Sequence, residues 1–292
     1  MTAAKDYRLG IVLSVGAAIA WSTAGFFTRL IPHDSFTILF WRGIFGAIGI
    51  LGLIIVLQRR NWWNELTRCR WLEFWYMLLT AAGMMMFILS LNMTSVAHNA
   101  VIYSTIPFIS ALLGWYYLKE KPSLSAAISS MVALLGVVVM MGGGSDGGFW
   151  GDVLAFGMTL CMAVSILLAR KYKKLATMPA VVGGSLLGSL LSWPFSDVLA
   201  VGSLDLGYLL AFGLISTALG NLFFAFGSRR IPAIETALIG ALDTPLAPLW
   251  VFIAFAEVPG INTIIGGSIV FAAVIVHIYL SQAGASASAH PG

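Results

Sequence analysis

Charged residues are scarce in this sequence of 292 residues. They make up 10% of the chain, whereas hydrophobic residues make up 59% and the mean hydropathy is +0.93. A soluble domain averages roughly a quarter charged residues, so this chain has too few of them to cover a surface that faces water. The composition therefore excludes a soluble globular protein and predicts a chain that lies in a lipid bilayer.

Residues that build disulfides, metal centres and nucleotide sites are also few. Two cysteines, Cys69 and Cys161, cannot form a disulfide framework, and we expect both to be free thiols. The four histidines are spread along the chain, and none pairs with another at the spacing of metal ligands. None of the six lysines follows the Gly-rich run of a phosphate-binding loop. We therefore expect no metal, no cofactor and no ATP-driven pumping by this chain alone.

Ten apolar stretches follow one another along the chain, separated by short connections. A helix needs about 20 apolar residues to cross the hydrocarbon core of a bilayer, and each stretch is close to that length. They cover 9–31, 36–57, 71–92, 96–117, 123–142, 149–169, 178–196, 204–227, 232–254 and 261–281. A transmembrane barrel would show alternating segments of about ten residues instead. The sequence predicts an all-α integral membrane protein with ten transmembrane helices.

Positive charge is concentrated in every second gap between these stretches. Fourteen of the sixteen Lys and Arg residues lie there: Lys5, Arg8, Arg59, Arg60, Arg68, Arg70, Lys119, Lys121, Arg170, Lys171, Lys173, Lys174, Arg229 and Arg230. Short cytoplasmic loops retain Lys and Arg, so we predict a multi-pass protein of the bacterial inner membrane with both termini in the cytoplasm. Because orientation accounts for the positive charge, we expect no nucleic-acid partner.

The two halves of the chain resemble each other weakly. Residues 95–122 and 232–259 align at a constant offset of 137, which pairs Glu120 with Glu257 and places a proline two residues later in each copy. Both segments contain the fourth stretch of a five-helix half. Since five is an odd number, the second half must enter the membrane upside down relative to the first.

The chain is therefore predicted to consist of two inverted five-helix repeats, 1–145 and 146–282, followed by a disordered tail, 283–292. The residues of the tail are small and polar. A segment of this composition cannot bury enough apolar surface to become ordered. Inverted repeats place a substrate site near the middle of the bilayer, at the interface between the halves.

Prolines lie in the middle of the two corresponding helices. Pro107 belongs to the fourth stretch, and Pro245 and Pro248 belong to the ninth. A proline inside a helix removes one backbone hydrogen bond and permits bending. The three prolines are candidate hinges, and a static kink is the alternative.

Polar residues inside membrane spans are costly and mark candidate functional sites. In the fourth stretch, His98, Asn99 and Tyr103 could bind a polar head group or stack on an aromatic ring, or they could simply form a helix entrance that is wetted by water. In the first stretch, Trp21 and Ser22 could contact a substrate, whereas packing between helices is the alternative for Trp21.

Two acidic residues lie inside the ninth stretch. Asp243 is the deepest acid in the chain, and we expect it to face a cavity because a carboxylate exposed to lipid would cost roughly 2.5–3.5 kcal/mol. Glu235 lies nearer the cytoplasmic end, where it could instead reach Arg229 or Arg230. Asp243, Glu235 and His98 are the candidates for relaying a proton, and passive equilibration of the substrate stays open.

Two motifs carry a resemblance to a known family. They are AAIAWSTAGFFTRL at 17–30, and WYYLKEKPS at 115–123 where the fourth stretch ends. With ten helices in two inverted halves, the chain resembles the EamA-type exporters of the drug/metabolite transporter superfamily, and it is similar to bacterial amino-acid exporters of the YddG type. The resemblance implies a cavity lined by helices one, three and four and by helices six, eight and nine.

The resemblance implies a secondary transporter that exports small neutral metabolites, above all aromatic and other neutral amino acids, by alternating access. Drug-like amphiphiles, nucleosides or sugar derivatives are the alternative cargo. An intramembrane enzyme would need a nucleophile beside a base, or a metal cluster, and neither is visible, so we expect no enzyme. The expected partners are a small-molecule substrate and the lipid bilayer, and the chain could act as a monomer or a homodimer.

Overall fold

The computed structural model describes residues 3–58, 63, 70–94, 96–141, 148–256 and 258–287. Within these residues the chain forms helices and no strand, so the all-helical prediction is confirmed. Nine helices in this part of the chain are long and apolar enough to cross a membrane, and Leu124–Met140 is apolar but shorter. The count of ten membrane spans therefore stays a prediction.

Some residues that the sequence singled out lie outside the described part of the chain, namely Arg59, Arg60, Arg68, Cys69 and Glu257. The side chain of His98 is also outside it, although the backbone of His98 belongs to a helix.

The described helices follow the predicted stretches closely. In the first half they are α1 (Ala3–Leu30), α2 (Ser35–Gln58), α4 (Trp71–Met93), α5 (Val96–Tyr103), α6 (Ile106–Leu113), the π-helical η2 (Gly114–Leu118) and α7 (Leu124–Met141). In the second half they are α8 (Phe149–Lys171), α9 (Thr177–Ser192), η3 (Trp193–Phe195), α10 (Ser203–Phe212), the π-helical η4 (Gly213–Leu219), α11 (Gly220–Gly227), α12 (Ala233–Gly240), α13 (Asp243–Phe255) and α14 (Ile261–Ala287).

The predicted disordered tail is wrong in its first part. The last helix, α14, continues to Ala287 rather than ending near residue 281, so 283–287 are helical, and 288–292 lie outside the described residues. Extending a helix that already exists requires no new nucleus. Because alanine is the best helix former, the alanine-rich sequence at this point can continue the helix.

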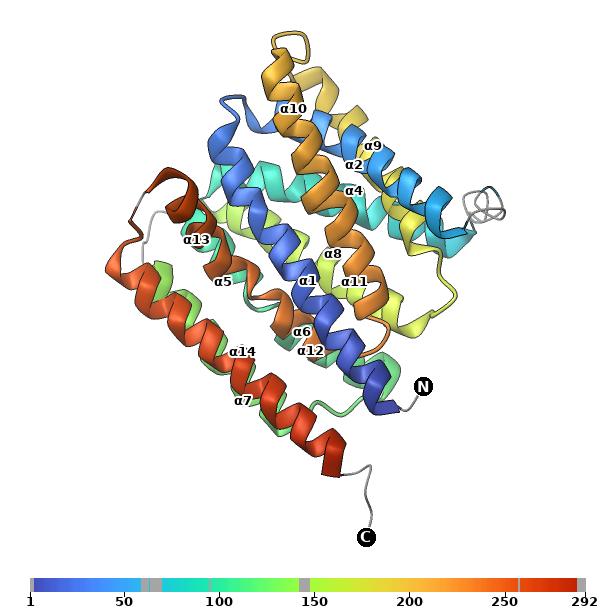
Figure 1. Ribbon diagram of the computed structural model, residues 1–292, viewed down its shortest axis with the longest axis vertical. Coiled ribbons are helices and arrows are strands. Elements are labelled where there is room, and N and C mark those ends of the chain that lie inside the picture. The colour runs from blue at the N-terminus through green and yellow to red at the C-terminus, as the bar shows by residue number, and fades with distance from the viewer. Residues whose placement is uncertain are drawn as a thin grey trace.

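The helices lie roughly side by side in one elongated bundle (Figure 1). The last helices of the two halves, α7 and α14, pack together along one edge, while α2, α4 and α9 pack on the other side and α1 lies against α11 and α13. Gly136 and Gly266 allow the close approach of α7 and α14. A Cβ on Gly136 would lie 2.8 Å from the Gly266 carbonyl oxygen, and small residues of this kind let helices pack backbone to backbone.

The fourth and ninth predicted stretches are each broken at the same repeat position. Helix α5 ends before Ser104 and Thr105, and α12 ends before Ala241 and Leu242, at the offset of 137 that the sequence alignment uses. The start and end of α5 and α12 and the start of α6 and α13 also differ by 137. The weak sequence similarity between the two halves therefore corresponds to a close repetition of the backbone structure.

The ends of these two broken helices repeat as well. Lys119 and Ala256, again 137 residues apart, are the non-glycine residues of the described chain with a positive φ, at 58° and 54°. Each follows the last helical residue of its span and turns the chain into the next connection. L-amino acids adopt this left-handed conformation at a cost of about 1–2 kcal/mol, so its occurrence in both copies is a shared feature of the turn.

The prolines lie where the second segments begin. Pro107 is the second residue of α6 and Pro245 is the third residue of α13. Proline is well tolerated in the first turn of a helix, where its missing N–H has no partner to lose, and it disfavours helical geometry in the residue before it. Pro248 differs, because it lies inside α13 without a break. Whether these breaks act as hinges stays a prediction.

The two broken helices run in opposite directions. In Figure 1 the chain passes from α5 to α6 toward the lower side of the bundle, and from α12 to α13 away from it, with α6 packed against α12. We call the end of the bundle where α6 and α12 lie the basic end, because Lys119, Lys121, Arg170, Arg229 and Arg230 gather there.

Candidate functional site

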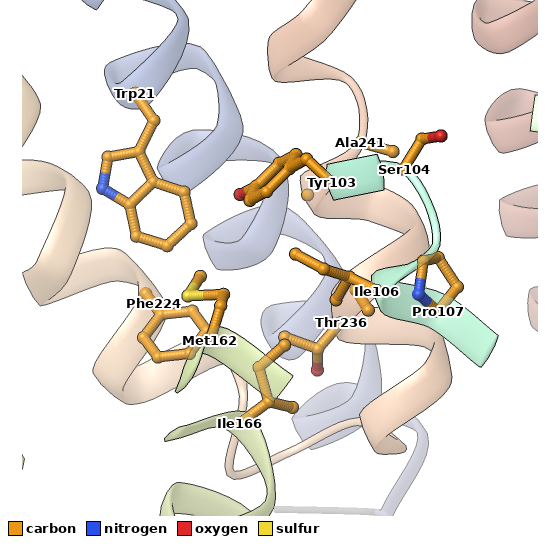
Figure 2. Close-up of a pocket in the computed structure, with 12 residues that line it drawn as sticks. Trp21, Tyr103, Ser104, Ile106, Pro107, Met162, Ile166, Phe224, Thr236 and Ala241 are labelled. Carbon is orange, nitrogen blue, oxygen red and sulfur yellow. The ribbon is translucent and has the colours of Figure 1, made fainter. Parts of the chain in front are cut away.

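A small cavity lies where the two broken helices meet the first helix. It is lined by Trp21, Tyr103, Ser104, Ile106, Pro107, Met162, Ile166, Phe224, Thr236, Ala237, Gly240 and Ala241. These residues come from α1, the break between α5 and α6, α8, α11 and α12 with its break (Figure 2). The space for the centres of water molecules is about 20 Å³, which is enough for roughly one water molecule.

Two aromatic side chains project into this cavity. Figure 2 shows Trp21 reaching it from α1 and Tyr103 from the end of α5, with Phe224 below Trp21. The Trp21 and Phe224 rings are 5.3 Å apart between centroids and tilted by 44°. Gly220 makes room for the indole, since a Cβ there would lie 2.5 Å from Trp21 Nε1. The arrangement offers aromatic faces for stacking against an apolar or aromatic group.

The break in the first copy also places polar backbone at the cavity. Pro107 has no N–H, so the carbonyl of Tyr103, four residues earlier, lacks the helical hydrogen bond that another residue would donate. The hydroxyls of Ser104 and Thr105 donate hydrogen bonds to the carbonyls of Val101 and Ile102 at 2.7 and 2.6 Å. They are therefore not donated to the Tyr103 carbonyl. The Tyr103 carbonyl is therefore a candidate hydrogen-bond acceptor for a bound molecule.

Asp243 lies at the equivalent break in the second copy, at the start of α13. Its repeat counterpart is Ile106, which lines the cavity. The carboxylate accepts a hydrogen bond from Thr244 Oγ1 at 3.1 Å and is partly exposed, and Asp243 follows Ala241 of the cavity lining by two residues. A carboxylate at this depth can bind a cationic group.

Two of the predicted substrate residues, Trp21 and Tyr103, line the cavity, whereas Ser22, Asn99 and Asp243 are not among the residues that line it. Ser22 is 2% exposed, and its hydroxyl donates to the Ile19 carbonyl and accepts from Trp250 Nε1 at 2.8 Å, which ties α1 to α13. Asn99 is buried and donates from Nδ2 to Ser90 Oγ on α4.

Glu235 does not pair with Arg229 or Arg230 as the sequence suggested. The Tyr7 hydroxyl donates to Glu235 Oε2 at 2.5 Å, and His277 Nε2 lies 3.8 Å from the same oxygen. The reason is the direction of the side chain: Glu235 is on the face of α12 that packs toward α1 and α14, and residues 229 and 230 precede that helix.

The two arginines instead help to close the basic end. Arg229 donates to the Leu175 carbonyl and to Thr177 Oγ1, and Arg230 Nε lies 3.0 Å from Asp6 Oδ1. Arg170 links two further spans. Its Nε donates to Glu120 Oε1 at 2.9 Å and its Nη1 donates to the Arg229 carbonyl at 2.9 Å.

The opposite end is also tied across the two halves. His33 Nε2 lies 3.1 Å from Asp205 Oδ2, and the backbone N–H of Asp197 donates to Thr37 Oγ1 at 2.8 Å. Asp34 caps α2 by accepting hydrogen bonds from the Phe36 and Thr37 backbones and the Thr37 hydroxyl. Although burial opposes the change, these hydrogen bonds hold the pKa of the Asp34 carboxyl below its usual range.

The sequence reasoning missed most of the residues that line the cavity. Thr236, Gly240 and Ala241 are the counterparts of Asn99, Tyr103 and Ser104 at the offset of 137. The repeat could therefore have identified them. Ile166 and Phe224 carry no such signal, because an apolar residue in an apolar helix does not reveal which neighbour it faces. Helix three was also expected to line the cavity, but the described residues of α4 do not contribute to it.

Metal binding finds no support in the described residues, which contain no cluster of three or more His, Cys, Asp or Glu side chains that could hold an ion. The cavity itself offers aromatic faces and backbone carbonyls, and Asp243 lies two residues beyond Ala241 of its lining.

The chain has membrane-length helices in two copies, and one span of each copy is broken where the two copies meet at a central cavity. This is the architecture of a membrane transporter. The model of the EamA-like transporter family matches residues 8–142 and 149–279, one match for each half. The chain therefore belongs to the EamA-like transporter family, within the drug/metabolite transporter superfamily, and members of this family are transporters rather than enzymes.

A solved crystal structure is similar to this chain over 94% of its length and 97% of the other chain, with a TM-score of 0.79 and 17% identity. At that identity the likeness shows the fold alone. No curated protein matches the chain.

Proposed function

We propose that the protein exports small neutral metabolites, above all aromatic and other neutral amino acids, across the bacterial inner membrane by alternating access. One observation carries the proposal. Both broken helices bring their free backbone ends to one cavity that also holds Trp21 and Tyr103 and lies near the deep carboxylate of Asp243.

The chemistry around the breaks suits a zwitterion. The first segments, α5 and α12, present carbonyls at their C-terminal ends, and these carbonyls and Asp243 would bind an ammonium group. Of the second segments, α6 begins without an acidic residue, so its N-terminal end favours a carboxylate, whereas the N-terminal end of α13 already carries Asp243. The rings of Trp21 and Tyr103 would contact an aromatic or apolar side chain.

The size of the cavity and the closure of both ends support alternating access. A space for about one water molecule cannot hold an amino acid, so the helices must separate before the substrate binds. Polar contacts between spans close the basic end, and His33 with Asp205 ties the opposite end. Opening one end at a time would carry the substrate across.

We assign the basic end to the cytoplasm because short cytoplasmic loops retain Lys and Arg. A cysteine that replaces Gly143 should then react with an impermeant thiol reagent outside intact cells, whereas the native Cys69 should not. The opposite labelling pattern would reverse the orientation.

The test of function is uptake into liposomes that contain the purified full chain alone. Radiolabelled phenylalanine should accumulate to equilibrium, and unlabelled neutral amino acids should compete with it, while empty liposomes should show no uptake. Uptake that no amino acid reduces would overturn the amino-acid assignment.

A second candidate cargo is favoured by the apolar part of the lining. Met162, Ile166 and Phe224 offer surface to drug-like amphiphiles, nucleosides or sugar derivatives that carry no ammonium group. Competition by these compounds, with none by amino acids, would select this alternative.

A further inference from the structure

A buried cluster of ionisable groups lies outside the central cavity, near the basic end. Glu235 of α12 accepts the hydrogen bond of Tyr7 from α1 and lies 3.8 Å from His277 of α14. The two ring nitrogens of His277 lie 3.4 Å from Ser125 Oγ on α7 and 3.2 Å from Ser281 Oγ. The cluster therefore joins α12, one segment of a broken helix, to three other helices.

The burial of this cluster limits the charge that it can carry. The side chains of His277 and Glu235 are 1% and 9% exposed, and an uncompensated buried charge costs several kcal/mol. The favourable states are an imidazolium beside a carboxylate and a neutral imidazole beside a carboxylic acid. In both states the two residues together hold one proton.

A pocket adjoins this cluster. Glu235 also lines a pocket of about 80 Å³ at the basic end, together with Ser110, Glu120 and Lys121. The other charged groups near it have partners of their own, since Glu120 pairs with Arg170 and Arg230 pairs with Asp6. His277 and Tyr7 are the groups that α14 and α1 direct at Glu235, and Lys121 faces the pocket.

We propose that Glu235, His277 and Tyr7 form a proton-binding site that closes the basic end of the transporter. The site holds one proton while α12 packs against α1 and α14. When α12 moves away, Glu235 and His277 become hydrated and the proton passes to water in the pocket. The inference depends on the alternating access proposed above, which requires this end to open.

The difference in bound protons sets the direction of the pH dependence. Above about neutral pH a carboxyl group and an imidazole in contact with water are both without the extra proton, so the open site holds none there, whereas the closed site holds one. A rise in pH above that value therefore favours the open state, by at most about tenfold per pH unit. Below that value the open site also binds a proton on histidine, and the dependence disappears.

The test measures opening directly in the purified full chain carrying Cys69→Ser, Cys161→Ser and Ser110→Cys. Ser110 is 1% exposed and lines the pocket, and its hydroxyl has no hydrogen-bond partner among the described residues, so a buried thiol should fit. Its rate of reaction with a methanethiosulfonate reagent is divided by the rate of an exposed cysteine, Lys173→Cys. This ratio removes the ionisation of the thiol itself from the pH dependence.

The ratio should rise by up to about 50-fold between pH 6.5 and 8.5. Glu235→Gln keeps the shape of the side chain but removes the titrating carboxylate, and it should abolish the rise. Glu120→Gln, the same substitution in the same pocket, should retain the rise, because Glu120 pairs with Arg170 and is not part of the Glu235 cluster. Should the Glu235→Gln variant fail to fold, His277→Gln should shift the rise to lower pH, since the hydrated state would then bind a proton only on glutamate.

Each contrary result has a distinct meaning. A flat ratio in the parent, a rise that survives Glu235→Gln, or an unchanged profile in His277→Gln overturns the proton site. A Ser110→Cys thiol that never reacts at any pH shows that the basic end stays closed, which overturns the alternating access and this inference with it.

Discussion

The two broken helices have the same backbone and different side chains. Segments α5 and α12 both contain eight residues, the breaks differ by 137 in the sequence, and both spans end at a left-handed residue. Yet Ile106 of the first copy faces the cavity where the second copy has Asp243 nearby, and Asn99 is replaced by Thr236. A shared backbone with unequal side chains indicates that the break belongs to the fold, whereas each copy brings different chemistry to it, aromatic rings from the first copy and the nearby Asp243 from the second.

The comparison extends to the polar contacts of the two first segments. In α5, Asn99 bonds to Ser90 within the same half of the chain. In α12, Glu235 reaches Tyr7 of the other half and His277. Movement of α12 would therefore break the contact between Glu235 and Tyr7, which joins the two halves. Movement of α5 against α4 would break the bond between Asn99 and Ser90, which lies within one half.

The largest expected difference between the copies concerns the charge at the break. Asp243→Asn should raise the KM of an amino-bearing substrate by about 10- to 150-fold, the equivalent of losing a charged hydrogen bond of about 1.5–3 kcal/mol. Liposome uptake at several substrate concentrations measures it. Ile106→Val, at the same position of the first copy, should leave the KM nearly unchanged. Equal effects of the two substitutions would remove the proposed asymmetry.

The prolines test whether the shared break moves. Pro107→Ala and Pro245→Ala each restore an N–H, and a new backbone hydrogen bond of about 0.5–1.5 kcal/mol across the break would slow turnover by about 2- to 10-fold. Pro248→Ala serves as the control, because Pro248 lies in α13 away from the break. The rate of transport at saturating substrate distinguishes them. Unchanged rates for Pro107→Ala and Pro245→Ala would identify a static kink.

The smallest expected effect concerns the two left-handed residues. Ala256→Gly should raise the stability of the folded chain by about 0.5–1 kcal/mol, because glycine adopts a positive φ without steric cost. Lys119→Gly should gain less, since it also removes the contact of Lys119 Nζ with the Tyr116 ring, 5.6 Å from the centroid. Thermal unfolding in detergent measures both. A larger gain at residue 119 would contradict the assignment of a shared backbone strain.

Much of the architecture could be read from the sequence, because it depends on local composition. The length of an apolar stretch sets where a membrane helix begins and ends, and α4 starts at Trp71 as expected. Prolines disfavour helix in the residue before them, so Pro107 and Pro245 marked both breaks to within a few residues. The disordered tail was predicted to begin too early, at residue 283, because small residues such as alanine occur both in disordered segments and in helices.

The candidate site was only partly predictable. Trp21 and Tyr103 were found because large amphipathic side chains stand out in an apolar helix, and Asp243 because a deep carboxylate is costly. Ser22 was expected at the substrate, but its hydroxyl is occupied by the Trp250 indole. No local pattern signals a contact between residues that are 228 positions apart.

The sequence by itself determined the helices, the positions of their breaks and the existence of two related halves, because hydropathy, proline and a repeated offset are local or periodic properties. Only the tertiary structure decided which faces of those helices meet. It brought Tyr103 toward Asp243, enclosed Glu235 with Tyr7 and His277, and reduced the central cavity to the volume of about one water molecule. These outcomes depend on the rotation of each helix about its axis, which is set by close packing against neighbours that lie far away in the sequence.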